Sequence, residues 1–267
     1  MTVGKPKHKL AYKVSAVAFG IAVLFFAGCS VSMRMTLPGD AVDPEGVIGR
    51  LDHLSDLLQT NKQIFRVRLL EKGRTFSGDG ALFYRAPDTL QLSIYGPPFT
   101  TLWMQMLKQG DSLIMVLPKE NRVVRASSGD PGPVTRLAGS EGLTDAEFLG
   151  GVTGIFNIDS FRRPGMRAYA AVKGEIESLR LADDLMVYEF AYNHELEAVV
   201  HFVHYYKGQK QREILRSDFK EIGGLKRATK TVYRDYFEDR EIIVLVGKEE
   251  VNLKLAKNAF QILLPDS

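Results

Sequence analysis

Residues 80–107 read GALFYRAPDTLQLSIYGPPFTTLWMQML, and this stretch decides the fold. Over 89–95 and again over 102–107, apolar side chains occupy every second position. A period of two is typical of a half-buried β-strand, because successive side chains of a strand point to opposite faces of the sheet. Pro87 and Gly96 separate the runs and supply turn residues. Short strands joined by such turns predict a meandering antiparallel sheet.

The same pattern extends outward from this stretch. Alternation begins near Gln63, and further strands are predicted at 112–117, 122–127, 170–181, 185–192, 197–206, 211–221, 225–236 and 241–255. No linker rich in proline, glycine or serine divides them. We therefore expect one mainly antiparallel β domain with two helical insertions.

The first helical insertion begins at Asp43-Pro44-Glu45, which combines a capping side chain, a proline in the first turn and an acid near the helix N-terminus. We expect it to end near Thr60. Its apolar face is predicted to contain Val47, Leu51, Leu54 and Leu58.

The second helical insertion is predicted from Thr144 to Phe156, with a capped start at Thr144-Asp145-Ala146-Glu147. Three glycines inside it weaken the helical propensity. They are Gly150, Gly151 and Gly154.

The N-terminus has the layout of an export signal. Residues 1–13 are basic and polar, and residues 14–27 form an apolar run of 14 residues. A helix of that length spans about 21 Å, less than the roughly 30 Å hydrocarbon core of a bilayer. A short apolar segment between a basic start and small residues is typical of a secretory signal.

The run Phe26-Ala27-Gly28-Cys29 resembles the lipobox of bacterial lipoproteins. That resemblance implies cleavage before Cys29, acylation of its thiol and new amine, and a membrane anchor; an uncleaved anchor helix is the alternative. By resemblance to the lipoprotein sorting rule, Ser30 points to the periplasmic side of the outer membrane. The predicted organisation is a signal peptide at 1–28, a lipid anchor and linker at 29–43, and one domain at 44–267.

The composition excludes several classes of protein. The chain has 267 residues, of which 45% are hydrophobic and 25% charged, as in ordinary globular proteins. Residues 1–28 hold four lysines and no acid, so the rest of the chain has 31 bases against 32 acids. A near-neutral body gives no reason to expect a nucleic acid partner. The single cysteine excludes an intrachain disulfide framework.

The sequence carries no recognisable catalytic motif. It lacks G-x-S-x-G, a P-loop, G-x-G-x-x-G and H-E-x-x-H. His201 and His204 have a spacing seen in metal ligands, but in a strand an offset of three places the two rings on opposite faces. We therefore predict no catalytic residue, no metal site and no cofactor.

Aromatic and methionine side chains are frequent in the predicted strands. Each one fills a core or lines an apolar hollow, and methionine makes such a hollow adaptable to flexible chains. The loop at 95–101 contains Pro97 and Pro98, which stiffen it and present Phe99 at its tip. Phe99 either folds back onto the sheet or contacts a membrane or ligand.

The stretch Gly80–Leu92 resembles a strand pair of the LolA/LolB lipoprotein carrier family, with glycine, proline and alternating apolar residues at the family's spacing. Residues 96–102 are similar to the loop that follows in LolB-like proteins, with Phe99 in place of leucine and Thr100 where glycine is common. Residues 110–123 continue the likeness. It covers about 45–130 and is architectural beyond that.

The resemblance implies an incomplete antiparallel β-barrel of about 10–11 strands, with helices over its open side and a hydrophobic cavity for acyl chains. In LolB-like proteins the exposed loop residue serves delivery of lipoprotein to the membrane, a role that would fall to Phe99. Candidate cavity-lining residues are Phe83, Leu92, Ile94, Trp103, Met104, Met106, Met115, Tyr188, Phe190 and Phe202.

The expected function is that of a lipid-anchored, monomeric carrier or acceptor without enzymatic activity. Its expected partners are membrane lipid through acylated Cys29, acyl chains or lipoproteins as cargo, and a soluble periplasmic carrier. The alternative is a periplasmic sensor or envelope-assembly module that uses the same fold to bind a peptide or lipid signal.

Overall fold

The computed structural model describes residues 37–96, 101–127, 144–256 and 258–262. The chain divides into two units, Met1–Thr36 and Leu37–Ser267, and every described residue belongs to the second. The signal peptide, Cys29 and the loop at 97–99 lie outside the described residues, so their roles stay predictions.

Strands make up most of the described chain. They are β1 Asp40–Val42, β2 Thr60–Glu71, β3 Arg74–Arg85, β4 Thr89–Gly96, β5 Thr101–Gln109, β6 Ser112–Leu117, β7 Arg122–Ser127, β8 Arg167–Lys173, β9 Ile176–Ala182, β10 Met186–Asn193, β11 Ala198–Tyr206, β12 Gln209–Ile222, β13 Leu225–Asp235 and β14 Arg240–Val251. The helices are α2 Pro44–Leu57 and α4 Asp145–Thr153, with short 3-10 turns η1 Pro118–Glu120 and η2 Ile158–Ser160.

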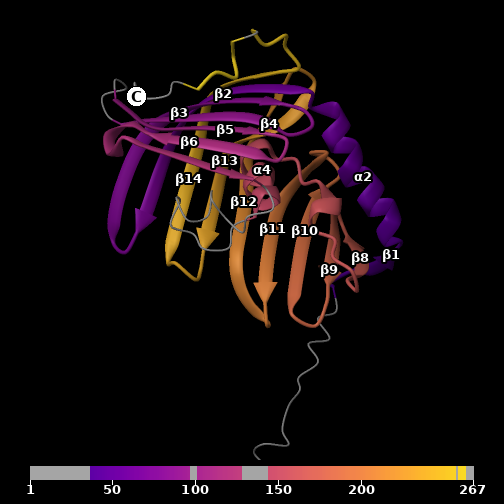
Figure 1. Ribbon diagram of the computed structural model, residues 1–267. Coiled ribbons are helices and arrows are strands. Elements are labelled where there is room, and N and C mark those ends of the chain that lie inside the picture. The colour runs from indigo at the N-terminus through magenta and orange to yellow at the C-terminus, as the bar shows by residue number, and fades with distance from the viewer. Residues whose placement is uncertain (1–36, 97–100, 128–143, 257, 263–267) are drawn as a thin grey trace, which may run out of the picture. The chain divides into compact units, whose positions relative to one another are not determined.

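The described strands form one 14-stranded antiparallel sheet in the order β1-β8-β9-β10-β11-β12-β13-β14-β2-β3-β4-β5-β6-β7. Strands β1 and β7 stand at its edges, so the sheet is not closed into a barrel. In Figure 1, strands β2–β6 cross the direction of β11–β14, because the sheet turns strongly across its width. The predicted mainly β, incompletely closed antiparallel fold is confirmed.

The sheet has 14 described strands, more than the 10–11 that were predicted, and two local features account for much of this difference. Residues Asp40–Val42, which the sequence placed in a linker, form β1 and pair with β8. The predicted strand 170–181 divides at Gly174, which has a φ of 58°, into β8 and β9. A three-residue edge strand carries no periodicity, so its pairing could not be read from the sequence.

Helix α2 begins as predicted. The Asp43 side chain accepts hydrogen bonds from the backbone N–H groups of Glu45 and Gly46, at 3.3 and 3.2 Å. The helix ends at Leu57 rather than near Thr60, because Thr60 already belongs to β2. Among the described residues, no helix is long and apolar enough to cross a bilayer.

The buried apolar residues form two clusters on the helix-covered face of the sheet. One cluster joins α2 and η2 to strands β8–β12, and the other joins α4 and the C-terminal end of β14 to strands β2–β6. Figure 1 shows α4 within the curve of the sheet. It shows α2 beside the end of the sheet that contains β8 and β9. We call the face that carries both clusters the inner face.

Candidate functional site

The inner face beside α4 is the candidate functional site. Strands β2–β5 and β14 present apolar side chains there that are only partly buried, and we call these residues the apolar floor. They are Val67, Phe76, Ile94, Trp103, Met104, Val244 and Val246. Phe76 follows the alternation that places Leu82 on the inner face, and it is 46% exposed. The floor therefore presents apolar surface to solvent or to a ligand.

Glycine residues allow aromatic rings to lie close to the backbone of the floor. A Cβ at Gly96 would lie 2.0 Å from the ring of Trp103, and one at Gly80 would lie 2.3 Å from the ring of Phe65. Any larger residue at these two positions would displace a ring. Gly96, which the sequence indicated as a turn residue, and Gly80, which lies inside β3, thus both serve packing on the floor.

The predicted cavity-lining residues are divided between several places. Leu92, Met106 and Met115 are fully buried in the core under α4, whereas Ile94, Trp103 and Met104 belong to the partly exposed floor. These six share one part of the inner face. Phe83 does not, because it alternates with the inward residues Leu82 and Tyr84 and so lies on the outer face.

The three remaining candidates lie in the other core. Tyr188, Phe190 and Phe202 pack around Phe156 and Phe161, with ring centroids 5.1–6.3 Å apart. All five rings are no more than 2% exposed. The centre of this half of the inner face is thus filled by side chains, and these three residues do not line an open surface.

Helix α4 is fixed at its N-terminus by a buried carboxylate. Glu147 accepts a hydrogen bond from the backbone N–H of Thr144 at 2.8 Å and completes the predicted capping box. The same carboxylate lies 2.9 Å from Nη1 of Arg212 and 2.8 Å from Nδ1 of His204. All three of these ionisable side chains are at most 7% exposed, so the start of α4 is tied to β11 and β12.

The electrostatic balance at Glu147 favours its charged form. Burial alone would raise the pKa of this carboxyl, but His204 and Arg212 outweigh the burial and lower the pKa below its usual value. A carboxylate that keeps its charge inside the protein keeps α4 attached over the ordinary pH range.

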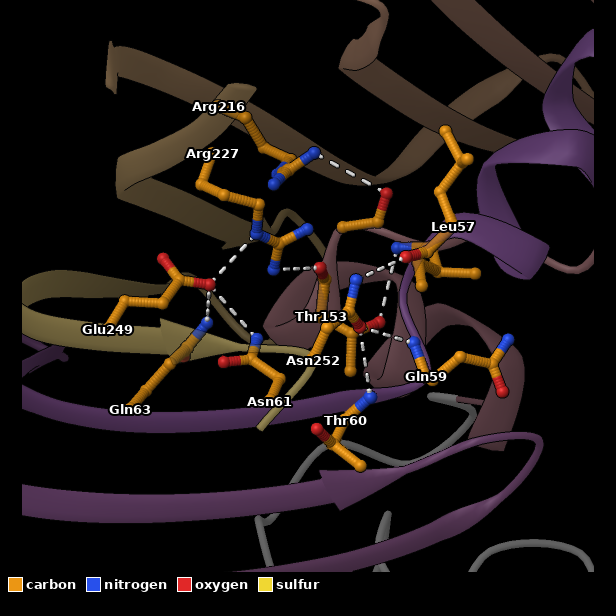
Figure 2. A network of polar contacts seen from close by, with 12 residues as sticks. Leu57, Gln59, Thr60, Asn61, Gln63, Thr153, Arg216, Arg227, Glu249 and Asn252 are labelled. Carbon is orange, nitrogen blue, oxygen red and sulfur yellow. Dashed lines mark hydrogen bonds and ion pairs between the residues drawn. The ribbon is translucent and has the colours of Figure 1, made fainter. Parts of the chain in front are cut away.

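The C-terminal end of α4 is held by two buried arginines, which Figure 2 shows side by side. Arg227 donates to the backbone carbonyl of Thr153 at 2.6 Å, and Arg216 donates to that of Gly154 at 3.4 Å. Positive charge at this end complements the helix dipole. Glu249 pairs with Arg227 at 2.8 Å and also accepts from the side chains of Asn61 and Gln63.

The end of α2 is tied to the same corner of the molecule. The side chain of Asn252 donates to the carbonyl of Leu57 and accepts from the backbone N–H of Gln59, both at 2.8 Å (Figure 2). Between the ends of α2 and α4 lies a pocket of about 40 Å³, whose walls include Leu54, Leu58, Ile155 and Arg216. None of the predicted cavity-lining residues borders this pocket.

Sequence reasoning missed the charged residues that hold α4. The sequence does carry a pattern there, because Arg212 and Arg216 flank Ile214 at a spacing of two within one predicted strand. That spacing places all three on one face, which here is the inner face. A buried charge at an inward strand position needs a partner, and this was the signal available.

The histidines behave as the strand alternation predicted. His201 lies 3.0 Å from Glu213, which faces away from α4, whereas His204 lies against Glu147 on the inner face. Within the described ranges, no group of three or more His, Cys, Asp or Glu residues is arranged to hold a metal ion.

We compared the chain with protein families, curated proteins and solved structures. No protein-family model matches the chain, and no curated protein matches its sequence. Solved structures do match. A DUF1329 family protein from Desulfovibrio piger has a TM-score of 0.62 at 12% identity, with 82% of this chain and 98% of that chain covered.

A LolA superfamily protein from Nitrosomonas europaea gives a TM-score of 0.55 at 12% identity, covering 83% of this chain and 99% of its own. The fold is LolA-like. A domain from Vibrio parahaemolyticus, described as an outer membrane lipoprotein-sorting protein, gives a TM-score of 0.57 at 13% identity and covers 82% and 97% of the two chains. The similarity therefore covers nearly the full length of each of these three neighbours.

Proposed function

We propose that the protein is a lipid-anchored carrier or acceptor whose LolA-like domain binds the acyl chains of lipidated cargo on the apolar floor. The observation that carries the proposal is the floor itself, which presents Phe76, Met104 and Val244 beside a helix held in place by buried charges. The neighbour described as an outer membrane lipoprotein-sorting protein supports a cargo of this class.

The energetics of the floor suit a long apolar ligand. Each CH₂ group removed from water contributes about 0.8 kcal/mol, so an acyl chain that covers several floor side chains gains several kcal/mol. Methionine at Met104 can change its side-chain conformation to follow a flexible chain. The binding needs no covalent chemistry, and we propose no enzymatic activity.

The N-terminal sequence supports a proposed anchor. We propose that acylated Cys29 attaches the protein to the periplasmic side of the outer membrane, because several acyl chains hold a protein on a bilayer essentially permanently. In this arrangement Phe99 is the residue through which cargo passes to the lipid surface. The proposed cargo consists of lipoproteins that a soluble periplasmic carrier delivers. We propose that this protein accepts them as a monomer.

Two neighbouring residues of β14 provide the test of the floor. Val244 faces inward opposite Val67 of β2, whereas Leu245 is 42% exposed on the outer face. We expect Val244→Gln to weaken binding of a fluorescent fatty acid about tenfold, because an unpaired amide would be buried under the ligand. The matched control Leu245→Gln should bind the probe like the unmodified protein.

Equal affinity of both variants for the probe would remove the floor from the mechanism. Specific capture of a protein partner by a chain that retains no lipid would favour the sensor or envelope-assembly function instead. Displacement of the probe by acylated peptide, but not by the same peptide without its acyl chain, would identify the cargo class.

A further inference from the structure

The pocket between the ends of α2 and α4 combines apolar walls with an excess of positive charge. Its charged lining residues are Glu197, Arg216, Lys226 and Arg227, and its apolar ones are Leu54, Leu57, Leu58, Ile155, Ala198 and Leu225. Glu197 and Lys226 are exposed, so the mouth lies beside them, whereas Arg216 and Arg227 are buried at its inner end.

Arg216 is the unusual member of this set. It is 7% exposed and donates from Nη1 to the carbonyls of Val199 at 3.0 Å and Gly154 at 3.4 Å. Its Nε is buried without a hydrogen-bond partner, and no carboxylate among the described residues forms an ion pair with it. A buried guanidinium without an anion is costly, and such groups are normally paired.

The neighbouring charges do not supply that anion. Glu249 is the acid that acts on Arg216, but it is already bound by Arg227, Asn61 and Gln63. Burial, followed by repulsion from Arg227, lowers the pKa of Arg216 to about 9, and Glu249 offsets this only in part. At the mouth, Lys226 is paired with Glu221 at 3.2 Å.

The size of the pocket selects the ligand. A water molecule needs roughly 10–15 Å³ of cavity, so about 40 Å³ holds about three water-sized groups. This matches the three heavy atoms of a carboxylate and is small for the five of a phosphate. The leucine walls suit the aliphatic carbon that a carboxylate carries.

We propose that this pocket binds a carboxylate, with Arg216 as its counter-ion and the leucines of α2 around its first carbon atoms. The carboxylate belongs either to a free small acid or to the end of a fatty acid. The proposal does not depend on cargo binding, because none of the floor residues lines the pocket.

Calorimetric titration of the full chain in lipid nanodiscs tests the proposal, with sodium acetate and sodium octanoate as probes and chloride at equal ionic strength as the blank. We expect both acids to bind and phosphate not to bind. Arg216→Met should lower the affinity for acetate at least tenfold. Octanoate binding that is tighter than acetate binding, is weakened in Arg216→Met and is unchanged in the floor variant Val244→Gln would identify a fatty acid. Equal binding of the two acids would identify a free acid.

Two exposed residues keep the test independent of folding. Lys226→Met should weaken acetate binding a few fold, and Glu197→Gln should strengthen it, because the two changes alter the charge at the mouth in opposite directions. Absence of any acetate binding beyond the chloride blank would overturn the proposal. An unchanged affinity for acetate in Arg216→Met would also overturn it. So would Lys226→Met and Glu197→Gln variants whose affinities for acetate do not change in opposite directions.

Discussion

The carboxylate of Glu147 and the guanidinium of Arg212 lie 2.9 Å apart, with exposed fractions of 0% and 6%. This pair joins α4 to the middle of the sheet. Breaking a buried pair leaves one charge without its partner and typically costs about 3–5 kcal/mol, whereas an exposed pair contributes less than about 1 kcal/mol.

We therefore expect Glu147→Gln to lower the free energy of unfolding by about 3 kcal/mol, measured by urea denaturation. Glu45, which is 66% exposed and pairs with Arg162, provides the matched control. Glu45→Gln should change stability by less than about 1 kcal/mol. Similar losses in both variants would show that the buried pair does not hold α4.

Gly154 ends α4 with a φ of 78°, and a Cβ there would lie 2.1 Å from the guanidinium of Arg216. We expect Gly154→Ala to destabilise the protein by more than the roughly 1–2 kcal/mol that left-handed backbone costs a non-glycine residue. Gly165 has a φ of 89° with open space around it, so Gly165→Ala isolates the backbone cost. Equal thermal shifts in the two variants would contradict the role of the close approach to Arg216.

The outer face predicts a pH dependence of stability. Burial would raise the pKa of Glu213, but hydrogen bonds from Lys210, Tyr236, His201 and Arg234 lower it to about 2. Because the folded pKa lies below the ordinary value of 4.5, this stabilisation is present above pH 4.5 and is lost as the pH falls towards about 2.

Comparison of the unmodified protein with Glu213→Gln between pH 6 and pH 2.5 checks this effect. The variant lacks the titrating carboxylate, so the difference in unfolding free energy should be largest at pH 6 and shrink with acid. A difference that stays constant over this range would rule out Glu213 as the source.

Phe99 is expected to serve cargo delivery and not folding. Phe99→Glu should preserve the circular dichroism spectrum and abolish transfer of lipidated cargo to liposomes, because a charge at the loop tip prevents contact with the bilayer. Phe237 in the β13–β14 turn is 70% exposed, and Phe237→Glu serves as the control that should transfer normally. Unchanged transfer by Phe99→Glu would remove this residue from the mechanism.

The strand pattern could be predicted because it is local. The strands at 89–95 and 102–107, the capping box at Thr144 and the cap at Asp43 each depend on residues close in the sequence, and each appears in the structure. The glycines of α4 were interpreted from propensity alone. In the structure Gly150 and Gly154 are packing requirements, since a Cβ would lie 2.4 Å from the ring of Phe156 at Gly150 and 2.1 Å from the guanidinium of Arg216 at Gly154.

The candidate site could be predicted only in part, because it depends on which distant strands meet. The sequence indicated apolar inward positions but could not show that Tyr188, Phe190 and Phe202 fill a separate core. Nor could it pair Glu147 with Arg212, 65 residues away, since that contact exists only after β12 packs under α4. Long-range ion pairs leave no periodic signal in a single sequence.

Identification of what the protein carries when purified tests the central claim most directly. Native mass spectrometry of the full chain, followed by lipid extraction, should detect an acylated amphiphile that Val244→Gln loses and Leu245→Gln retains. A chain that carries no amphiphile, takes up none from lipid extract and binds no displaceable fatty acid probe would contradict the account.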